Sequence, residues 1–216
     1  MQNLEDIAER IRQSFEARTA ARDKALTQTR ALTRHCANAI RAVHRDETEA
    51  AEENLNAACL LVKALREDLA EYPELYYAGY TQDALKEYAE ANIVAALIRS
   101  SKLPTPEELD IEHATYLLGL AEAVGELRRR CLDIMRHGHS DEAERLLSHM
   151  DDIYAILVTM DYPDAITGGL RRLTDIVRGV TERTRGDMTI SLRQEMLEHS
   201  LKRLETELAR QSEHHT

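Results

Sequence analysis

The chain contains few of the residues that interrupt helices. Only four prolines and eight glycines occur among its 216 residues. Alanine, leucine, glutamate and arginine are abundant, and all four favour the helical state. No run of alternating β-branched residues, the pattern of a half-buried strand, stands out. The sequence therefore predicts an all-α protein. Because no low-complexity linker divides it, we expect residues 1–216 to form a single domain.

Several other features are missing, and each absence excludes a class of protein. No stretch of about 18 apolar residues occurs, so we expect no membrane span. The first residues, Met1 to Asp6, are polar and acidic, unlike a secretory signal peptide. The three cysteines, Cys36, Cys59 and Cys131, lie far apart and form no C-x-x-C pair. They are typical of buried thiols in a reducing compartment, so we expect a cytoplasmic protein.

Basic residues are outnumbered by acidic ones. The chain has 28 Lys and Arg against 39 Asp and Glu, a net charge of −11. This balance argues against nucleic-acid binding through overall charge, although a local basic face could still bind it. The N-terminal helical stretch has such a face, which includes Arg18, Arg22, Arg30 and Arg34. These arginines could hold RNA phosphates, or they could form an ordinary solvated helix face.

The spacing of apolar residues divides the chain into about seven helices. Thr105-Pro106-Glu107-Glu108 predicts the start of the fourth, with threonine as the cap and proline at the first helical position. Gly138 and Gly186 are expected to end the fourth and sixth helices. The expected ranges are about 3–45, 48–71, 81–101, 106–137, 140–160, 165–185 and 190–210.

Four carboxylates lie in two helical stretches that are otherwise rich in Ala, Leu, Ile and Val. Glu87 and Glu90 stand three residues apart, and Glu122 and Glu126 stand four apart. At 3.6 residues per turn, each spacing places the pair on one face of its helix. No basic residue lies between the members of either pair. Each pair therefore costs free energy unless a cation joins it.

A divalent metal is the simplest cation for such a cluster. Carboxylate oxygens are hard ligands that suit Mg²⁺ or Mn²⁺ better than zinc or copper. Neither stretch has the Glu-x-x-His motif of ferritin-like sites, which disfavours iron oxidation. The chain also has no P-loop, G-x-S-x-G or H-E-x-x-H motif. Metal-assisted phosphoryl chemistry is the favoured use of the cluster. The alternative is that some of these glutamates simply face solvent, as glutamates on helices usually do.

The sequence around these glutamates resembles the translin/Trax family, and specifically its Trax branch. Residues 116–127, Tyr-Leu-Leu-Gly-Leu-Ala-Glu-Ala-Val-Gly-Glu-Leu, resemble the Tyr-Leu-Leu-Gly segment of the family with its acidic residues. Residues 85–91 resemble the Trax stretch that contains Glu-Tyr-x-Glu, and Arg185-Gly186 is a further landmark. The similarity extends from about Arg22 to Ser200.

The resemblance implies an all-helical protomer that assembles into a hollow homo-oligomer, typically an octamer. It implies a Mg²⁺-dependent endoribonuclease that acts on single-stranded RNA inside this shell, with single-stranded DNA as an alternative ligand. The catalytic and metal-binding set carried over from Trax falls on Glu87, Glu90 and Glu122, with Glu126 as a further carboxylate. Translin itself lacks this acidic set, so the chain resembles the active branch.

The chain departs from the family pattern at two points. Glu122 stands where Trax has an aspartate, so its carboxylate is one methylene farther from the helix. The family also has basic residues just before the first acidic pair, whereas residues 77–83 contain none. We therefore expect basic residues elsewhere in the chain, such as those of the first helix, to bind the RNA.

Two other functions remain open at this point. An all-α nucleoside-triphosphate pyrophosphatase would also gather carboxylates on helices to bind Mg²⁺. A non-catalytic shell protein like translin would bind RNA or DNA through a degenerate site.

Overall fold

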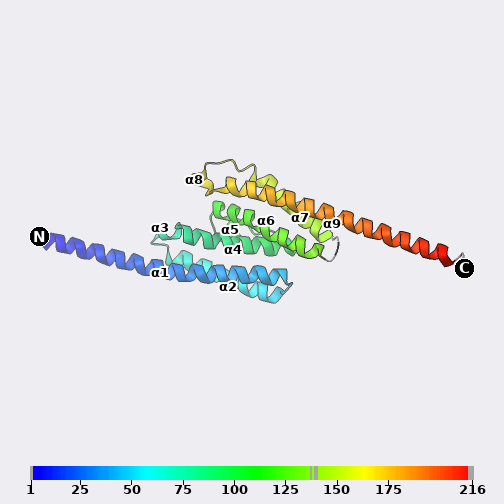
Figure 1. The fold of residues 1–216 in the computed structure, drawn as a ribbon. Coiled ribbons are helices and arrows are strands. Elements are labelled where there is room, and N and C mark those ends of the chain that lie inside the picture. Colours follow the sequence, from blue (N-terminus) through cyan, green and yellow to red (C-terminus); the bar gives the residue numbers. More distant parts are fainter. Residues whose placement is uncertain (1, 137, 139–140, 214–216) are drawn as a thin grey trace. The chain divides into compact units, whose positions relative to one another are not determined.

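The computed structural model describes residues 2–136, 138 and 141–213. Within that part of the chain it contains nine helices and no strand (Figure 1), which confirms the predicted all-α class. None of these helices is both long and apolar enough to cross a membrane. The fifth predicted helix is present as α7, and its predicted first residue, Ser140, lies outside the described residues. The helices are α1 (Gln2–His44), α2 (Thr48–Asp68), α3 (Pro73–Tyr76), α4 (Gly79–Ile98), α5 (Pro106–Leu109), α6 (His113–Met135), α7 (Asp141–Leu157), α8 (Asp164–Thr167) and α9 (Leu170–Glu213).

The helix predicted from 106 to 137 is in fact two helices. It breaks after the short α5, because Asp110 adopts a left-handed backbone conformation with a φ of 55°. The predicted start is present: the Thr105 hydroxyl accepts a hydrogen bond from the Glu108 N–H, and the Glu108 carboxylate accepts one from the Thr105 N–H. Past the end of α6, Gly138 has a φ of +113° and donates from its N–H to the Met135 carbonyl. The glycine predicted to end this helix therefore does so.

Gly186 does not end a helix, contrary to the prediction. The stretch expected at 165–185 begins in the short α8, and from Leu170 onward it forms one continuous helix, α9, with the stretch expected at 190–210. A glycine inside a helix costs about 1 kcal/mol relative to alanine, but it does not by itself break the backbone. Thr184 and Met188, on either side of it, are buried. Packing on both sides of the glycine therefore keeps the helix continuous.

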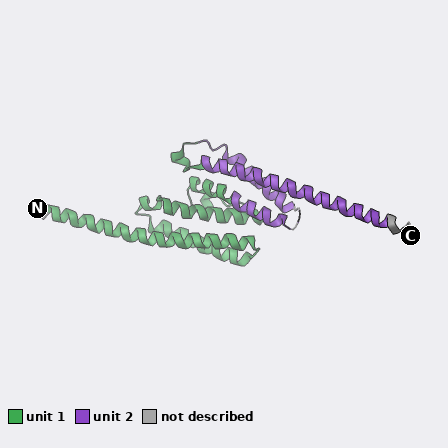
Figure 2. Ribbon diagram, viewed as in Figure 1, with its two compact units in different colours: residues 1–123, 162–170 green, residues 124–161, 171–216 purple. Residues whose placement is uncertain are grey.

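The chain forms two compact units (Figure 2). The first contains residues 1–123 and 162–170, and the second contains residues 124–161 and 171–216. The boundary falls inside α6, so the two carboxylates that the sequence places on this helix belong to different units: Glu122 to the first and Glu126 to the second.

In the first unit, α1 packs against both α2 and α4. Leu32 of α1 and Leu65 of α2 are fully buried. A hydrogen bond of 2.6 Å from Lys24 Nζ to Asp68 Oδ1 also joins these two helices. Most residues of α4 from Ala84 to Ile98 are buried, as the apolar sequence of this stretch predicts. Of the charged side chains on this part of α4, Glu90 is buried, while Lys86 and Glu87 are half-buried.

The second unit has its own core. Leu127 of α6, Met150 of α7 and Val177 of α9 are buried in it. Arg128 of α6 forms an ion pair of 2.9 Å with Asp187 of α9. This ion pair therefore joins α6 to α9 within the second unit.

A glycine brings α6 close to α4 in the first unit. A Cβ atom at Gly119 would lie 2.6 Å from the Cβ of Ala89 and 2.8 Å from the carbonyl oxygen of Lys86. Cβ atoms in proteins do not approach other atoms so closely, so a side chain here would push the two helices apart. The contact lies one turn before Glu122 and beside Glu90. The separation of these carboxylates therefore depends on the glycine.

We expect Gly119→Ala to lower the free energy of unfolding by about 1–3 kcal/mol, the usual cost of overpacking a closely packed interior. Gly125→Ala is the matched control, because a Cβ atom at Gly125 would meet no atom within 4 Å. Alanine there should stabilise the helix by up to about 1 kcal/mol. Urea denaturation of both variants measures the difference. A Gly119→Ala variant as stable as the parent would contradict the close contact of α4 and α6.

Candidate metal centre

Three of the four predicted carboxylates meet in the first unit. Glu87 and Glu90 come from one face of α4, and Glu122 comes from α6. Each offers one carboxylate oxygen, and these oxygens all lie within 4.8 Å of one another. Glu90 is buried, with 9% of its surface exposed, while Glu87 and Glu122 are half-buried. The two helices therefore present a compact set of oxygen ligands on a partly buried surface.

Glu126 lies one helical turn after Glu122, in the second unit. Its Oε2 lies 3.5 Å from Nη1 of Arg129 on the same helix. Its membership of the carboxylate set remains a prediction from the sequence.

Burial and a neighbouring like charge disfavour ionisation of Glu87. Burial raises the pKa of Glu87 above its ordinary value, and the neighbouring charge of Glu122 raises it further. Lys86 opposes this rise and Asp83 adds to it. The carboxylates also act on α1: burial, together with the charges of Glu87 and Glu90, raises the pKa of the Cys36 thiol to about 12. The carboxylates of the cluster therefore act on one another and on a buried thiol of α1.

A hard divalent cation fits this set of side chains. Mg²⁺ and Mn²⁺ prefer carboxylate oxygens and commonly bind through a few carboxylates, with water completing the shell. Glu87, Glu90 and Glu122 would be the protein ligands. Their mutual repulsion is the physical reason for such an ion to bind, because the cation offsets charge that the fold has brought together.

Lys86 is a member of the cluster that the sequence did not reveal. Its Nζ donates a 2.8 Å hydrogen bond to Oε1 of Glu122, and only 18% of its side chain is exposed. Burial by itself would lower the pKa of Lys86. The hydrogen bond to Glu122 and the charges of Glu122, Asp83 and Glu87 outweigh burial, so the pKa is raised. No local pattern marks this pair, because its members are separated by 36 residues.

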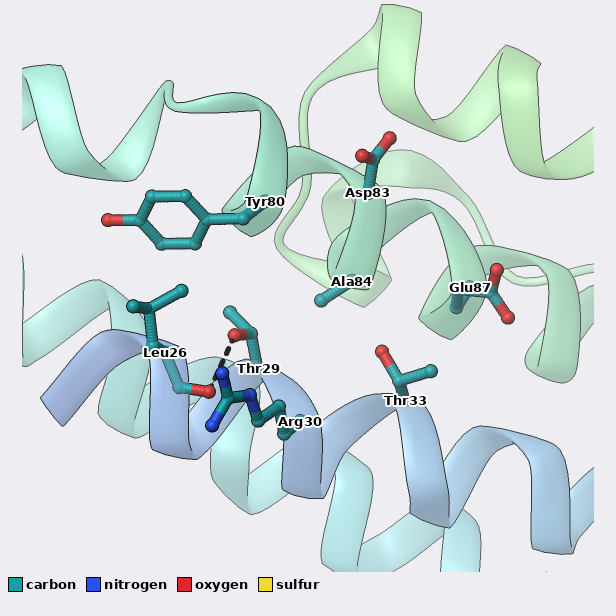
Figure 3. A pocket seen from close by; sticks show the side chains of 8 residues that line it. All are labelled: Leu26, Thr29, Arg30, Thr33, Tyr80, Asp83, Ala84 and Glu87. Carbon is teal, nitrogen blue, oxygen red and sulfur yellow. Dashed lines mark hydrogen bonds between the residues drawn. The ribbon is translucent and has the colours of Figure 1, made fainter. Parts of the chain in front are cut away.

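A surface pocket of about 430 Å³ adjoins the cluster through Glu87 (Figure 3). Arg30 and Thr33 of α1 line it together with Tyr80 and Asp83 of α4. Its other lining residues are Leu26, Thr29 and Ala84. The Tyr80 hydroxyl is buried and has no hydrogen-bond partner within the described part of the chain. The pocket therefore combines a cation, an aromatic ring and one edge of the carboxylate cluster.

The four arginines predicted to hold RNA differ in their surroundings, although all are exposed. Arg18 lies 3.6 Å from Glu74, and Arg22 lies 3.2 Å from Asp23. Among the residues that the structure describes, Arg30 and Arg34 form no ion pair. Arg30 lines the pocket beside Glu87, so it is the arginine best placed to meet a ligand of the cluster.

Comparison with known proteins identifies the family. The model of the translin family matches residues 6–208. An uncharacterised protein of Methanocaldococcus jannaschii is 34% identical over 194 residues, which cover 89% of this chain and 86% of that protein.

Solved structures show the same similarity. The structure of AfC3PO in complex with duplex RNA superposes with a TM-score of 0.81 at 34% identity, covering 88% of this chain and 98% of that chain. Apo-NeC3PO, at 20% identity, covers the same shares and has a TM-score of 0.76, which is a likeness of fold alone. Since the family model spans nearly the whole sequence, the chain belongs to the translin family.

Proposed function

We propose that this protein is a Mg²⁺-dependent endoribonuclease of the Trax-like branch that cleaves single-stranded RNA within a homo-oligomeric shell, with Mn²⁺ as an alternative ion. The observation that carries the proposal is the meeting of Glu87, Glu90 and Glu122 within 4.8 Å. Mere membership of the family does not require such a set. The complex of the related AfC3PO with duplex RNA supports RNA as the class of ligand.

The proposed chemistry divides between the ion and the side chains. When bound, a divalent cation offsets the charge of the phosphodiester and lowers the pKa of water, which favours hydrolysis. Glu87, Glu90 and Glu122 would hold the ion, and the close contact at Gly119 keeps the carboxylates of the two helices together. Arg30, at the pocket beside Glu87, would hold an RNA phosphate near the cluster, and Arg34, one turn on, would hold the next. An arginine is well suited to this because its guanidinium donates two parallel hydrogen bonds to phosphate oxygens.

Two helices carry exposed apolar stripes that support self-association. In α9, Leu197, Leu201, Leu204 and Leu208 are between 50% and 60% exposed. Their spacing of four, three and four residues is the heptad pattern of a helix that packs on a partner helix. Near the start of α1, Leu4, Ile7, Ile11 and Phe15 are also exposed. We propose that copies of the chain cover these stripes in the homo-oligomer, as an octamer.

We also propose that the protein acts in the cytoplasm. All three cysteines are free thiols, two of them buried, as in proteins of reducing compartments.

The double variant Glu87→Ala plus Glu90→Ala tests the site. With Mg²⁺, the parent should cleave labelled single-stranded RNA, and EDTA should abolish cleavage. We expect the variant to lose more than about a hundredfold in rate, beyond the 10–100-fold effect of residues that only support metal ligands. Glu67→Ala plus Glu71→Ala is the matched control, because it removes the same charge from exposed positions and should leave the rate unchanged.

Other outcomes of this assay separate the competing functions. Unchanged cleavage by the Glu87/Glu90 variant would show that the site assignment is wrong. Hydrolysis of nucleoside triphosphates in place of RNA would identify a pyrophosphatase. Binding of RNA or single-stranded DNA without cleavage would identify a non-catalytic shell. Duplex RNA, assayed beside the single strand, decides which form is the substrate.

Arg30→Ala tests the proposed phosphate contact. Binding of labelled RNA is measured in EDTA over a range of salt concentrations. Loss of one phosphate contact should reduce the slope of log K against log salt by about 0.7, the value for single strands. Arg45→Ala is the control: Arg45 is exposed just past the end of the same helix, about 22 Å from Arg30 at the helical rise per residue. Equal slopes for the two variants would exclude Arg30 from RNA binding.

Leu201→Glu plus Leu204→Glu tests the apolar stripe of α9. Two charges on a helix–helix seam should dissociate the oligomer into smaller species, because buried carboxylates without partners are costly. Sedimentation velocity measures the change. His199→Glu plus Thr206→Glu adds the same charges to the opposite face of the helix and should leave the oligomer intact. A parent protein that sediments as a monomer would contradict the shell.

A further inference from the structure

Lys86 donates a hydrogen bond to one carboxylate of the candidate metal centre. Its Nζ lies 2.8 Å from Oε1 of Glu122, and Glu122 also supplies one of the three carboxylate oxygens that lie within 4.8 Å of one another. Hydrogen bonds between ionised partners are roughly twice as strong as those between neutral groups. The ammonium of Lys86 is therefore a cation bound to one of the carboxylates that would hold a divalent ion.

The charges around Lys86 explain why it is there. Three carboxylates of the cluster carry three negative charges when ionised, and Lys86 offsets one of them. Asp83, one turn before Glu87, also attracts it. With so little of its side chain exposed, the ammonium interacts with these groups through less water than a surface lysine would.

The same charge works against a divalent ion. An ammonium that donates to Glu122 and a metal ion that binds Glu122 would be like charges within a few ångströms of each other. The lysine side chain is a flexible stem of four methylenes, so rotation about its bonds can move the ammonium away from Glu122.

We propose that Lys86 is an internal counter-ion that competes with the divalent ion for Glu122, so that metal binding requires the ammonium to leave this carboxylate. This inference rests on the proposed metal site and adds a regulator of its affinity. In the metal-free protein, Lys86 stabilises the cluster. When a divalent ion binds, it offsets the charge of Glu122 in place of Lys86, and the ammonium leaves this carboxylate.

Lys86→Gln tests the competition without an activity assay. Titration with MnCl₂, followed by the electron paramagnetic resonance signal of free Mn²⁺, measures the affinity. We expect the variant to bind Mn²⁺ at least about tenfold more tightly, the size of effect that loss of one charged hydrogen-bonding competitor should have. In EDTA its melting temperature should fall below that of the parent, and Mn²⁺ should raise it by more than it raises that of the parent. Lys86→Arg keeps the charge and should bind Mn²⁺ as the parent does.

Lys102→Gln is the matched control. It removes the same charge from an ion pair with Glu108 at 3.3 Å, but this lysine is 80% exposed and belongs to another part of the first unit. Its Mn²⁺ affinity should equal that of the parent.

Equal or weaker Mn²⁺ binding by Lys86→Gln, in a parent that does bind Mn²⁺, would overturn the competition and leave the metal site standing. Such a result would mean that Lys86 positions Glu122 for the ion. Absence of Mn²⁺ binding from both the parent and the variant would overturn the metal site itself, and the inference with it. Tighter binding by the variant supports the proposal whether or not RNA is cleaved.

Discussion

The contact between Gly119 of α6 and the backbone of α4 is the constraint on which the candidate site depends. Backbone atoms of Lys86 and the side chain of Ala89 lie where a Cβ atom at Gly119 would have to be. When two helices approach so closely, the side chains beside their contact are also held close to one another. Here those groups are carboxylates, so the close packing of Gly119 against Ala89 brings like charges together at the surface of the first unit.

One lysine of the first unit reduces the repulsion among these carboxylates. Lys86 offsets one carboxylate, and its hydrogen bond to Glu122 joins α4 to α6. Burial and the charge of Glu122 raise the pKa of Glu87, so the single positive charge of Lys86 does not fully offset the carboxylates around it. A partly buried set of carboxylates with one lysine among them is suited to bind a further cation. The electrostatic repulsion among these carboxylates is thus the physical basis for the proposed metal site.

Local sequence predicted much of the fold. The helical periodicity, the scarcity of proline and the capping box at Thr105 gave the helix class and several helix ends. It failed at Gly186, where a residue that often ends helices lies between the buried Thr184 and Met188. It also failed at Asp110, whose left-handed conformation divides α5 from α6 without a glycine or proline at that position. At Gly186 packing overrides the preference of the residue, whereas Asp110 is of a residue type that adopts the left-handed conformation more readily than most.

The sequence by itself determined that Glu87 and Glu90 share a helix face, since their spacing and the helical period leave no other arrangement. It could not determine that Glu122 joins them, because that requires α6 to pack on α4 at Gly119. Nor could it show that Lys86 reaches Glu122, since neighbouring residues on a helix point in different directions and the partner is far along the chain. Which charges share one site is therefore decided by tertiary packing, because electrostatic energy depends on distance in space and not in sequence.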